Sequence, residues 1–485
     1  MRILFGLIMA FGLAGAMPAS AKDALSLTPG TETAADGRPV RYEIGAIEVP
    51  ENRAKPGSRR ITVGVLRIKA AKPGGQPPIF LLVGGPGVTM LDTIGDPSPA
   101  ARRRLGSWLD YSATNDLVIV EQRGYTLRGD MLELHDPAMP LDRPATVEDD
   151  VAVMRRLANE AAAANPGRDL SGYTIAECAD DVDAVRRALG YPKIGLMGAS
   201  FGSQWSFAVL KRHPGTVARA LIASAEPLNN GYDMPGHVFA VLQRVAFEAE
   251  QDPALRPFIP QGGLIAAART VRDRFAKGPI TVDLPEGKVV IGLGDYQQAL
   301  FAKVVNAARW PAFVIDLYHG RYQAWAREVA EGRKAGTQSL IGPLIDTATG
   351  VTATRLAQLE SDPALDMLGR WNFAAYTASA GLWPSTDLGD GFRLPVRDET
   401  PILFVQGDWD ANTPMENLLD LLPWFPNARA LIVHRGQHNG PMPLLRDHPD
   451  TAAAALRFLR EGGMAELPSR VEAAPVKFAL PAASG

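Results

Sequence analysis

The chain has 485 residues, of which 46% are apolar, and its 50 basic and 53 acidic residues give a formal net charge of −3. A chain of this length can build a large core in about two or three folding units. The balance of charges leaves no basic excess of the kind that a nucleic-acid-binding protein needs. We therefore expect a small molecule or a short peptide as the partner, and no nucleic acid.

Residues 1–21 have the features of a secretory signal peptide. Arg2 supplies a positive charge, residues 3–17 form an apolar run too short for a comfortable membrane span, and Ala19-Ser20-Ala21 offers a cleavage site. The alternative is an uncleaved anchor. No later apolar stretch is long enough to cross a bilayer, so we expect an exported protein, periplasmic or extracellular, without a membrane span after signal removal. The single cysteine, Cys178, excludes an intramolecular disulfide, and its helical surroundings predict a buried thiol.

Strand and helix patterns alternate through residues 22–228, which we assign to the first part of a core. Segments 41–49 and 59–70 predict an antiparallel hairpin, and the apolar runs 78–83 and 117–120 predict buried strands. The pattern continues as a helix, a strand, a helix and a strand, over residues 174–189, 193–197, 200–212 and 217–225. This order predicts an α/β fold with a mostly parallel central sheet and helices on both faces.

Residues 229–397 break this rhythm. Helices are predicted there over residues 238–250, 263–275, 296–308 and 313–332, with a strand pattern only over 280–291. Strands and helices alternate again from residue 398 to residue 465, which predicts the second part of the core. The simplest architecture has a helical cap inserted between the sixth and seventh strands, and a loosely attached tail over residues 466–485.

The segment Gly198-Ala199-Ser200-Phe201-Gly202 lies where a predicted strand meets a predicted helix. A sharp turn between a strand and a helix holds a serine in a strained conformation with its hydroxyl exposed, and the flanking glycines avoid crowding. Ser200 is therefore the candidate nucleophile.

A serine hydroxyl needs a base, and the base needs an acid to orient it. Asp408 and Asp410 follow the strand predicted at 401–405; the Gly-x-x-Asp pattern favours Asp410, with Asp408 as a turn-forming residue. His434 and His438 follow the next strand, and the glycine-flanked loop favours His438 as the base, with His434 as a structural residue.

Acyl transfer also needs N–H donors for the oxyanion. The backbone N–H of Phe201 is one candidate, and the loop Gly84-Gly85-Pro86-Gly87 supplies another in Gly85. A phosphate-binding loop is the alternative for these glycines, but no Gly-Lys-Ser/Thr follows them. The sequence has no His-Glu-x-x-His and no dinucleotide fingerprint, so we expect neither a metal nor a cofactor.

These motifs, in this order, resemble the prolyl and tripeptidyl aminopeptidases of the α/β-hydrolase superfamily. The resemblance covers most of the chain outside the insertion, and its segments are Val49 to Arg53, Gly84 to Gly87, Glu121-Gln122-Arg123-Gly124, Asp180 to Gly190, Gly198 to Gly202, Gly407 to Pro414 and Gly436-Gln437-His438. It implies an α/β-hydrolase fold with a helical cap over the serine, cofactor-free hydrolysis, and peptide release from a free N-terminus. It also implies a triad of Ser200, Asp410 and His438, with Gly85 and Phe201 as oxyanion donors.

The chain departs from the family pattern at a few positions. Glu121 stands where the family usually has aspartate, Tyr125-Thr126-Leu127-Arg128 replaces a run of small residues, and Val83 stands where many relatives have histidine. Aminopeptidases of this branch hold the substrate amine with cap acids, for which Glu226, Glu248 and Glu250 are the candidates; the alternative for each is a solvated surface charge. The expected function is an exported serine peptidase forming an acyl-enzyme from short peptides. The alternatives are an esterase of small non-peptide acyl compounds with the same triad, and a non-catalytic binding protein on this scaffold. The sequence predicts no oligomeric state.

Overall fold

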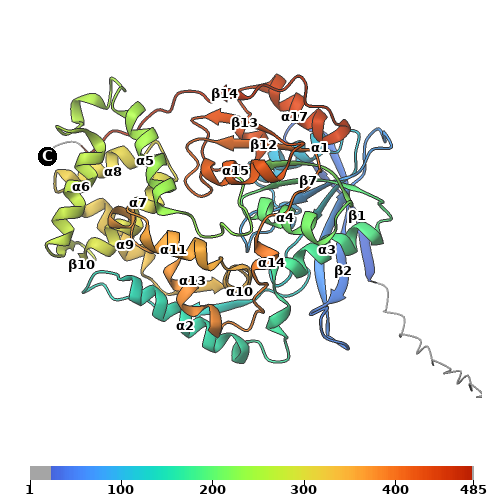
Figure 1. Ribbon diagram of the computed structural model, residues 1–485, viewed down its shortest axis with the longest axis horizontal. Coiled ribbons are helices and arrows are strands. Elements are labelled where there is room, and N and C mark those ends of the chain that lie inside the picture. Colours follow the sequence, from blue (N-terminus) through green and yellow to red (C-terminus); the bar gives the residue numbers. More distant parts are fainter. Residues whose placement is uncertain (1–22, 483–485) are drawn as a thin grey trace, which may run out of the picture.

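A computed structural model describes residues 23–482, so the predicted signal peptide lies outside the described residues. A ten-stranded sheet crosses the core in the order β1-β2-β3-β5-β4-β7-β8-β12-β13-β14 (Figure 1). Its strands are β1 (Ala24–Thr33), β2 (Pro39–Pro50), β3 (Arg60–Ile68), β4 (Ile79–Leu82), β5 (Leu117–Val120), β7 (Ile194–Ala199), β8 (Val217–Ala223), β12 (Ile402–Gly407), β13 (Arg429–His434) and β14 (Arg470–Glu472).

The strand directions confirm the predicted α/β class. The strands β1, β2, β3 and β5 pair antiparallel, and every pairing from β5 through β4 to β14 is parallel. Each residue of β4, β5 and β12 is buried, as expected for parallel strands covered on both faces. The expected hairpin is β2 and β3, while β1 was not predicted.

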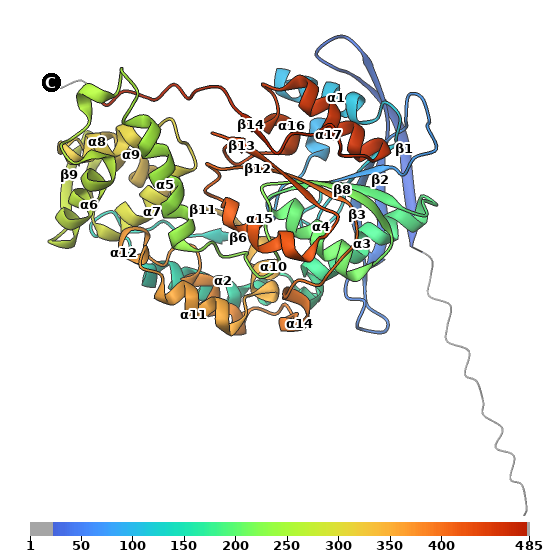
Figure 2. The ribbon, with the colours of Figure 1, turned by 45° about the horizontal axis from the view of Figure 1, so that its top comes forward.

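Helices cover both faces of this sheet (Figure 2). One apolar cluster joins the sheet to α3 (Ile175–Ala188), α4 (Phe201–Arg212) and α15 (Met415–Leu421), and contains Val182, Trp205 and Leu418. A second cluster joins the other face to α1 (Pro99–Tyr111) and α17 (Pro449–Glu461), and contains Trp108 and Phe458. The short helix α16 (Pro441–Leu444) follows β13. The carboxyl ends of the parallel strands are thereby held at one edge, where ligands of such folds bind.

The predicted insertion lies between β8 and β12. Its helices are α5 (Pro235–Ala249), α6 (Gly263–Ala276), α7 (Leu293–Val304), α8 (Trp310–Tyr318), α9 (Gln323–Gly332), α10 (Ile341–Thr349), α11 (Ala353–Ser361), α12 (Leu365–Leu368), α13 (Ala374–Ser379) and α14 (Asp390–Arg393). Its strands are β9 (Ile280–Leu284), β10 (Gly287–Ile291) and β11 (Gly336–Ser339). A separate apolar cluster, including Phe275, Tyr296 and Trp310, forms the core of the helices α5 to α9.

One predicted helix of the insertion is two helices in the structure. The pattern over 313–332 predicts a continuous helix, but α8 ends at Tyr318 and α9 begins at Gln323. Gly320 has a φ of 78° directly after α8, and the Arg321 N–H returns to the Asp316 carbonyl at 2.9 Å. A left-handed glycine with such a bond ends a helix.

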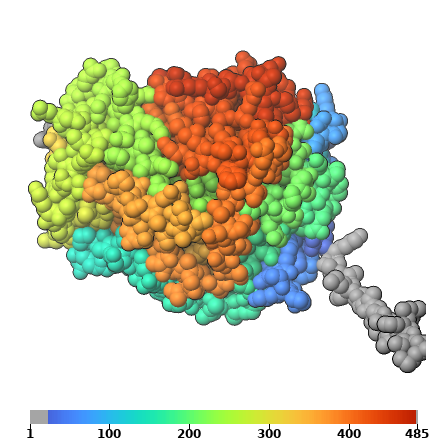
Figure 3. Space-filling view, viewed as in Figure 1, coloured from blue at the N-terminus to red at the C-terminus, as the bar shows by residue number. Residues whose placement is uncertain are grey.

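A segment from the first half of the chain packs with the insertion. Strand β6 (Glu133–Asp136) pairs antiparallel with β11, and α2 (Val147–Ala164) packs against α13. We call α5 to α14 together with β6 and α2 the cap. Figure 3 shows the green to orange surface of the insertion continuous with the red C-terminal part of the core on this face. The cap is therefore assembled from two stretches of sequence.

The C-terminal residues join the core to the cap, in contrast to the loose tail expected. Residues of β14 pair with β13, and the chain then runs to the cap (Figure 1). Val476 and Phe478 pack against the apolar cluster of the cap, and the Ala479 N–H donates to the Ala308 carbonyl at 2.8 Å. Across residues 23–482, no helix combines the length and apolar character that a membrane span requires.

Candidate active site

Ser200 lies at the turn between β7 and α4, in the conformation that its motif predicts. Its φ is 58° and its ψ is −134°, a region that non-glycine residues rarely occupy. A Cβ on Gly198 would lie 2.3 Å from the carbonyl oxygen of Gly202, and a Cβ on Gly202 would lie 2.2 Å from that of Leu82. Only glycine fits at these two positions, so the motif sets how sharply the chain turns at Ser200.

Asp410 and His438 form a hydrogen-bonded pair. The Nδ1 atom of His438 lies 2.9 Å and 3.0 Å from the two carboxylate oxygens of Asp410. Asp410 is fully buried, and it accepts hydrogen bonds from the N–H groups of Asn412 and Thr413 and from the Thr413 hydroxyl. Because Nδ1 faces the acid, Nε2 is the ring nitrogen left to act on a substrate or a nucleophile.

Ser200 and His438 line one cavity of about 420 Å³. Gly84 and Asn439 line it beside them, and much of its wall is apolar, with Met90, Trp108 and Met197. Ser224 helps to place both groups, because its carbonyl accepts from the Ser200 N–H and its hydroxyl hydrogen-bonds with the backbone of Asn439. The structure thus brings together the three residues that the sequence singled out as nucleophile, acid and base.

The glycine loop after β4 lies against Ser200. A Cβ on Gly84 would be 3.5 Å from the Ser200 Cβ, so the backbone of this loop approaches the serine closely. Gln122 braces the loop: its Nε2 donates to the Gly84 carbonyl at 2.9 Å, and its Oε1 accepts from the Gly87 N–H at 2.7 Å. Gln122 was not predicted as a functional residue, although its motif was recognised. Gly85 lies within this loop and Phe201 directly follows the serine, so both remain the predicted oxyanion donors.

Glu121 and Arg123, the neighbours of Gln122, have structural roles. The buried Glu121 accepts hydrogen bonds from the hydroxyls of Thr89 and Thr126 and from the Leu127 N–H. The two departures from the family motif, at Glu121 and in the run that contains Thr126, are therefore partners. Arg123 is fully buried and donates two hydrogen bonds to Asp181 of α3 and one to the carbonyl of Glu51.

The carboxyl groups of Glu226 and Asp233 stand near the triad acid, and Asp346 stands near Glu226. Burial raises the pKa of Glu226 well above its usual range, and the charges of Asp233, Asp346 and Asp410 raise it further. Burial and Asp410 likewise raise the pKa of Asp233, although Arg355 opposes this, and burial raises the pKa of Asp346 to about 7. All three residues keep part of their surface exposed. The Glu226 backbone is fixed to α4, because its N–H donates to the Ser203 hydroxyl at 2.8 Å.

The sequence named Glu226 as a candidate but missed Asp233 and Asp346. Asp233 precedes α5 and Asp346 lies within α10, and neither belongs to a motif. They are separated by more than a hundred residues along the chain, so no local spacing signals that they come together.

The other two predicted cap acids have partners elsewhere. Glu248 lies 2.7 Å from His434 Nε2 and forms an ion pair with Arg435 at 2.6 Å, which join α5 to the end of β13 and the residue after it. Glu250 accepts a hydrogen bond from the Leu264 N–H in the first turn of α6 at 2.7 Å. These contacts give both glutamates structural roles, and we leave them out of the proposed site.

Asp408 and His434, the alternative candidates for the acid and the base, lie next to each other. His434 Nδ1 lies 2.8 Å from Asp408, while its Nε2 faces Glu248. Both nitrogens of His434 are thus occupied, which agrees with the choice of His438 and Asp410. Among residues 23–482, no cluster of three or more histidine, cysteine, aspartate or glutamate side chains is arranged to hold a metal ion.

Residues 158–259 match the sequence model of a family described as "alpha/beta hydrolase fold". No curated protein matches the sequence. The similar solved structures include a proline iminopeptidase from Mycobacterium smegmatis, with 15% identity and a TM-score of 0.37 over 86% of this chain and 97% of that chain. They also include an esterase from Thermogutta terrifontis, with 15% identity and a TM-score of 0.34 over 86% and 99%, and an epoxide hydrolase from Vigna radiata, with 13% identity and a TM-score of 0.36 over 86% and 97%.

The family match covers β8, α4 and the Ser200 turn, and the observed sheet continues the same architecture on both sides of it. The order of the parallel strands, the helices on both faces and the helical insertion after β8 agree with this match. The core of the chain therefore has the α/β-hydrolase fold.

Proposed function

We propose that the protein is a serine hydrolase that cleaves short peptides from their free amino end. The observation that carries the proposal is the cavity that Ser200 shares with His438, whose ring is held by Asp410. In the proposed reaction the Ser200 hydroxyl attacks the scissile carbonyl while His438 accepts its proton. The N–H groups of Gly85 and Phe201 donate to the oxyanion.

After this attack His438 acts first as an acid toward the leaving amine and then as a base toward water. His438 returns the proton to the leaving amine, the C–N bond breaks, and the acyl group remains on the Ser200 oxygen. A water molecule, deprotonated by His438, then attacks the ester; the acyl–oxygen bond breaks, His438 returns the proton to the Ser200 oxygen, and the acid product leaves. Asp410 holds the ring orientation and stabilises the imidazolium throughout.

The carboxyl groups of Glu226, Asp233 and Asp346 support the choice of a free amino end. Burial raises the pKa of all three groups, so each ionised carboxylate is unfavourable without a positive partner. The α-ammonium group of a peptide would supply the missing positive charge and would be held at a fixed distance from Ser200. A blocked N-terminus offers no such charge, so we propose an aminopeptidase rather than an endopeptidase.

A second candidate is hydrolysis of small acyl esters. The observation that favours it is the apolar wall of the Ser200 cavity, where Met90, Trp108 and Met197 would accept an acyl chain. The same triad cleaves amides and esters, so the substrate decides between the two functions.

Labelling and a substrate panel test these proposals. A fluorophosphonate probe should label the wild-type chain and the Ser107→Ala control, which removes another serine of the same cavity, but not Ser200→Ala. Labelling that survives in Ser200→Ala would reject the nucleophile. The panel compares aminoacyl and tripeptidyl chromogenic amides with their N-acetylated forms and with short acyl esters. Turnover of free-amine amides alone supports the aminopeptidase, whereas turnover of esters alone rejects it.

We also propose that the chain is exported by its first 21 residues. N-terminal sequencing of the protein recovered from the producing cell should begin at Lys22. A sequence that begins at Met1 or Arg2 would contradict cleavage and support a retained anchor.

A further inference from the structure

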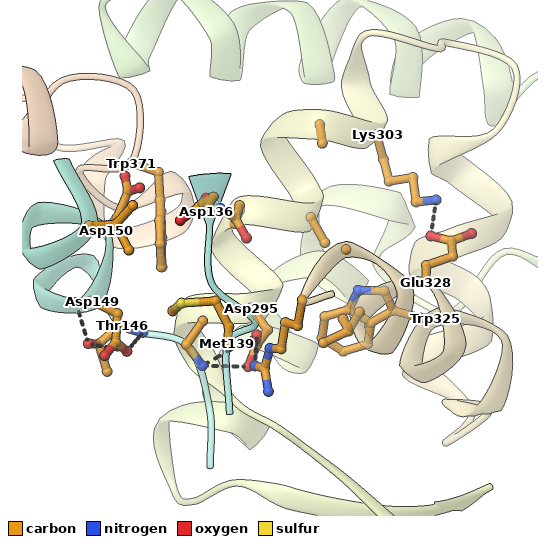
Figure 4. Close-up of a pocket in the computed structure, with 18 residues that line it drawn as sticks. Asp136, Met139, Thr146, Asp149, Asp150, Asp295, Lys303, Trp325, Glu328 and Trp371 are labelled. Atoms are coloured by element: carbon orange, nitrogen blue, oxygen red, sulfur yellow. Dashed lines mark hydrogen bonds and ion pairs between the residues drawn. The ribbon is translucent and has the colours of Figure 1, made fainter. Parts of the chain in front are cut away.

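A second cavity, of about 550 Å³, lies between the β6–α2 segment and the helices α7 and α9 of the insertion (Figure 4). Asp136 and Asp150 line it from the first side, and Ala299 and Trp325 from the second. None of the three proposed triad residues lines it. Its volume suits a small ligand or a side chain of a larger one.

The charges around this cavity do not balance. Its lining carries two bases and five carboxylates: Lys303, Arg333, Asp136, Asp149, Asp150, Asp295 and Glu328. Glu328 pairs with Lys303 and Asp295 with Arg333, while Asp149 and Asp136 pair with arginines outside the lining. Within residues 23–482, the Asp150 carboxylate has no ion-pair or hydrogen-bond partner. One carboxylate of the lining therefore lacks a counter-charge.

Asp150 lies in an environment that penalises its charge. Burial and the neighbouring Asp136 raise the pKa of Asp150 to about 6. Figure 4 shows Asp150, Trp371 and Asp136 at one end of the cavity and the Lys303–Glu328 pair at the other. The Trp371 indole is seated against glycines: a Cβ on Gly294 would lie 3.0 Å from its ring, and a Cβ on Gly369 would lie 2.8 Å from it. An aromatic ring and a carboxylate without a counter-charge thus share one end of the cavity.

We propose that this cavity is a second binding site, which takes an ammonium group carried on an alkyl chain. The ammonium group would neutralise Asp150 and gain a cation–π contact with Trp371. Its methylene groups would contact the apolar part of the wall, which includes Met139, Val153, Ala299 and Ala302. The chemistry fits the side chain of a lysine in a peptide and equally a free aliphatic diamine. The site does not depend on the reaction proposed for Ser200.

Helix α13 separates this cavity from the acids near the triad. It packs against both α2, which carries Asp150, and α10, which carries Asp346. The charges of Asp346 and Asp150 both raise the pKa of Tyr376 on α13, so Tyr376 is close to each. A cation in the cavity would therefore lie across α13 from Asp346 and outside the cavity of Ser200.

Calorimetric titration of the full chain with two cations and one neutral compound tests the proposal. The Ser200→Ala variant removes turnover, and the probes are Nα-acetyl-lysine N-methylamide, 1,5-diaminopentane and Nα-acetyl-norleucine N-methylamide. The acetyl group leaves the side-chain ammonium as the only charge of the lysine probe. We expect at least one cation to bind and the norleucine compound to bind at least about tenfold more weakly. The tighter cation identifies the source of the ammonium group.

Three further variants, each made in the Ser200→Ala chain, locate the bound cation. Asp150→Asn should weaken binding about tenfold, while Glu148→Gln, which removes a charge from an exposed position on the same helix, should not change it. Glu226→Gln, which alters the acids proposed to hold a substrate ammonium group, should keep the binding event that Asp150→Asn loses. Asp150 has no partner to lose, so the thermal midpoint of Asp150→Asn should not fall. Absence of cation binding, equal binding to Asp150→Asn, or loss in Glu226→Gln of the same binding event would overturn the proposal.

Discussion

The turn that carries Ser200 and the cap that lies beside it are held by different kinds of contact. Around Ser200 the contacts are short and involve the backbone: Ser224 accepts from the Ser200 N–H, and the Gln406 side chain accepts from the Ala225 N–H at 2.9 Å. The cap is held instead by charged side chains and by aromatic packing such as that of Phe275 against Trp325. The chemistry of the site thus depends on local sequence, whereas the surroundings of the substrate depend on residues distant in the chain.

The two regions meet at α5, which contacts the loops of both triad partners. Arg244 of α5 donates to the carbonyl of Asp408 at 3.1 Å, two residues before Asp410. Glu248, one turn further along, pairs with Arg435 in the loop that leads to His438. A displacement of α5 would therefore act directly on the loops that carry Asp410 and His438.

The largest expected effect comes from Asp410. Asp410→Asn should lower kcat about 10⁴-fold, because the amide no longer holds the His438 tautomer that accepts a proton from serine. The matched variant is Asp408→Asn, which breaks the pair with His434 and the contact with the Arg435 N–H. It should lower stability by about 1 kcal/mol and leave kcat within about fivefold of wild type. Steady-state kinetics and urea unfolding measure both, and a reversed ranking of the kcat losses would assign the acid to Asp408.

Glu226→Gln should give the next largest effect on activity, by weakening recognition of the substrate's free amine. If Glu226 holds the peptide ammonium, kcat/KM for free-amine amides should fall about thirtyfold, or about 2 kcal/mol. Turnover of N-acetylated amides and esters should not change. An equal loss for blocked and free substrates would mean that Glu226 acts on the triad rather than on the amine.

The same variant has a predictable effect on stability. The pKa of Glu226 is raised in the folded chain, so the wild type loses stability as the pH rises from the usual glutamate range toward that raised value. Glu226→Gln lacks this loss. The variant should match the wild type in acid and exceed it in stability at alkaline pH, as measured by urea unfolding across the pH range.

The features around Ser200 could be predicted from the sequence, whereas the grouping of the acids beside the cap could not. Most strands of the sheet, though not β1 and β14, were available from local patterns. So were the Ser200 turn and the choice of Asp410 and His438 over Asp408 and His434, because glycines and strand ends specify backbone shape. The grouping of Asp233 and Asp346 with Glu226 was not available, because it depends on how α5 and α10 pack.

The same limit explains the two wrong assignments in the cap region. The apolar pattern continues across residues 319–322, but Gly320 adopts a left-handed conformation and ends α8. The proline- and alanine-rich composition after residue 466 predicts a loose tail. Phe478 nevertheless packs against the apolar cluster of the cap, whose residues are distant from it in the sequence.

A smaller effect is expected at Gln122, which tests how rigid the core site must be. Gln122→Ala removes both contacts that brace the Gly84 to Gly87 loop, so the predicted oxyanion donor of Gly85 loses its fixed position. We expect kcat to fall about tenfold with KM changed less than threefold, since the contact acts on the transition state. A loss confined to KM would place this loop in substrate binding instead.

The smallest effect on activity should come from the C-terminal residues, which hold the cap rather than the site. Phe478→Ala removes a partly buried ring from the apolar cluster of the cap and should cost about 1 kcal/mol. Leu480→Ala, in the same segment but 55% exposed, is the matched control and should cost almost nothing. Hydrogen exchange should rise in α8, close to the Ala308 carbonyl that accepts from Ala479, while β7 and α4 stay protected. Equal deprotection of β7 and α8 would show that the cap and core unfold as one unit. The two regions would then differ in the contacts that hold them but not in their stability.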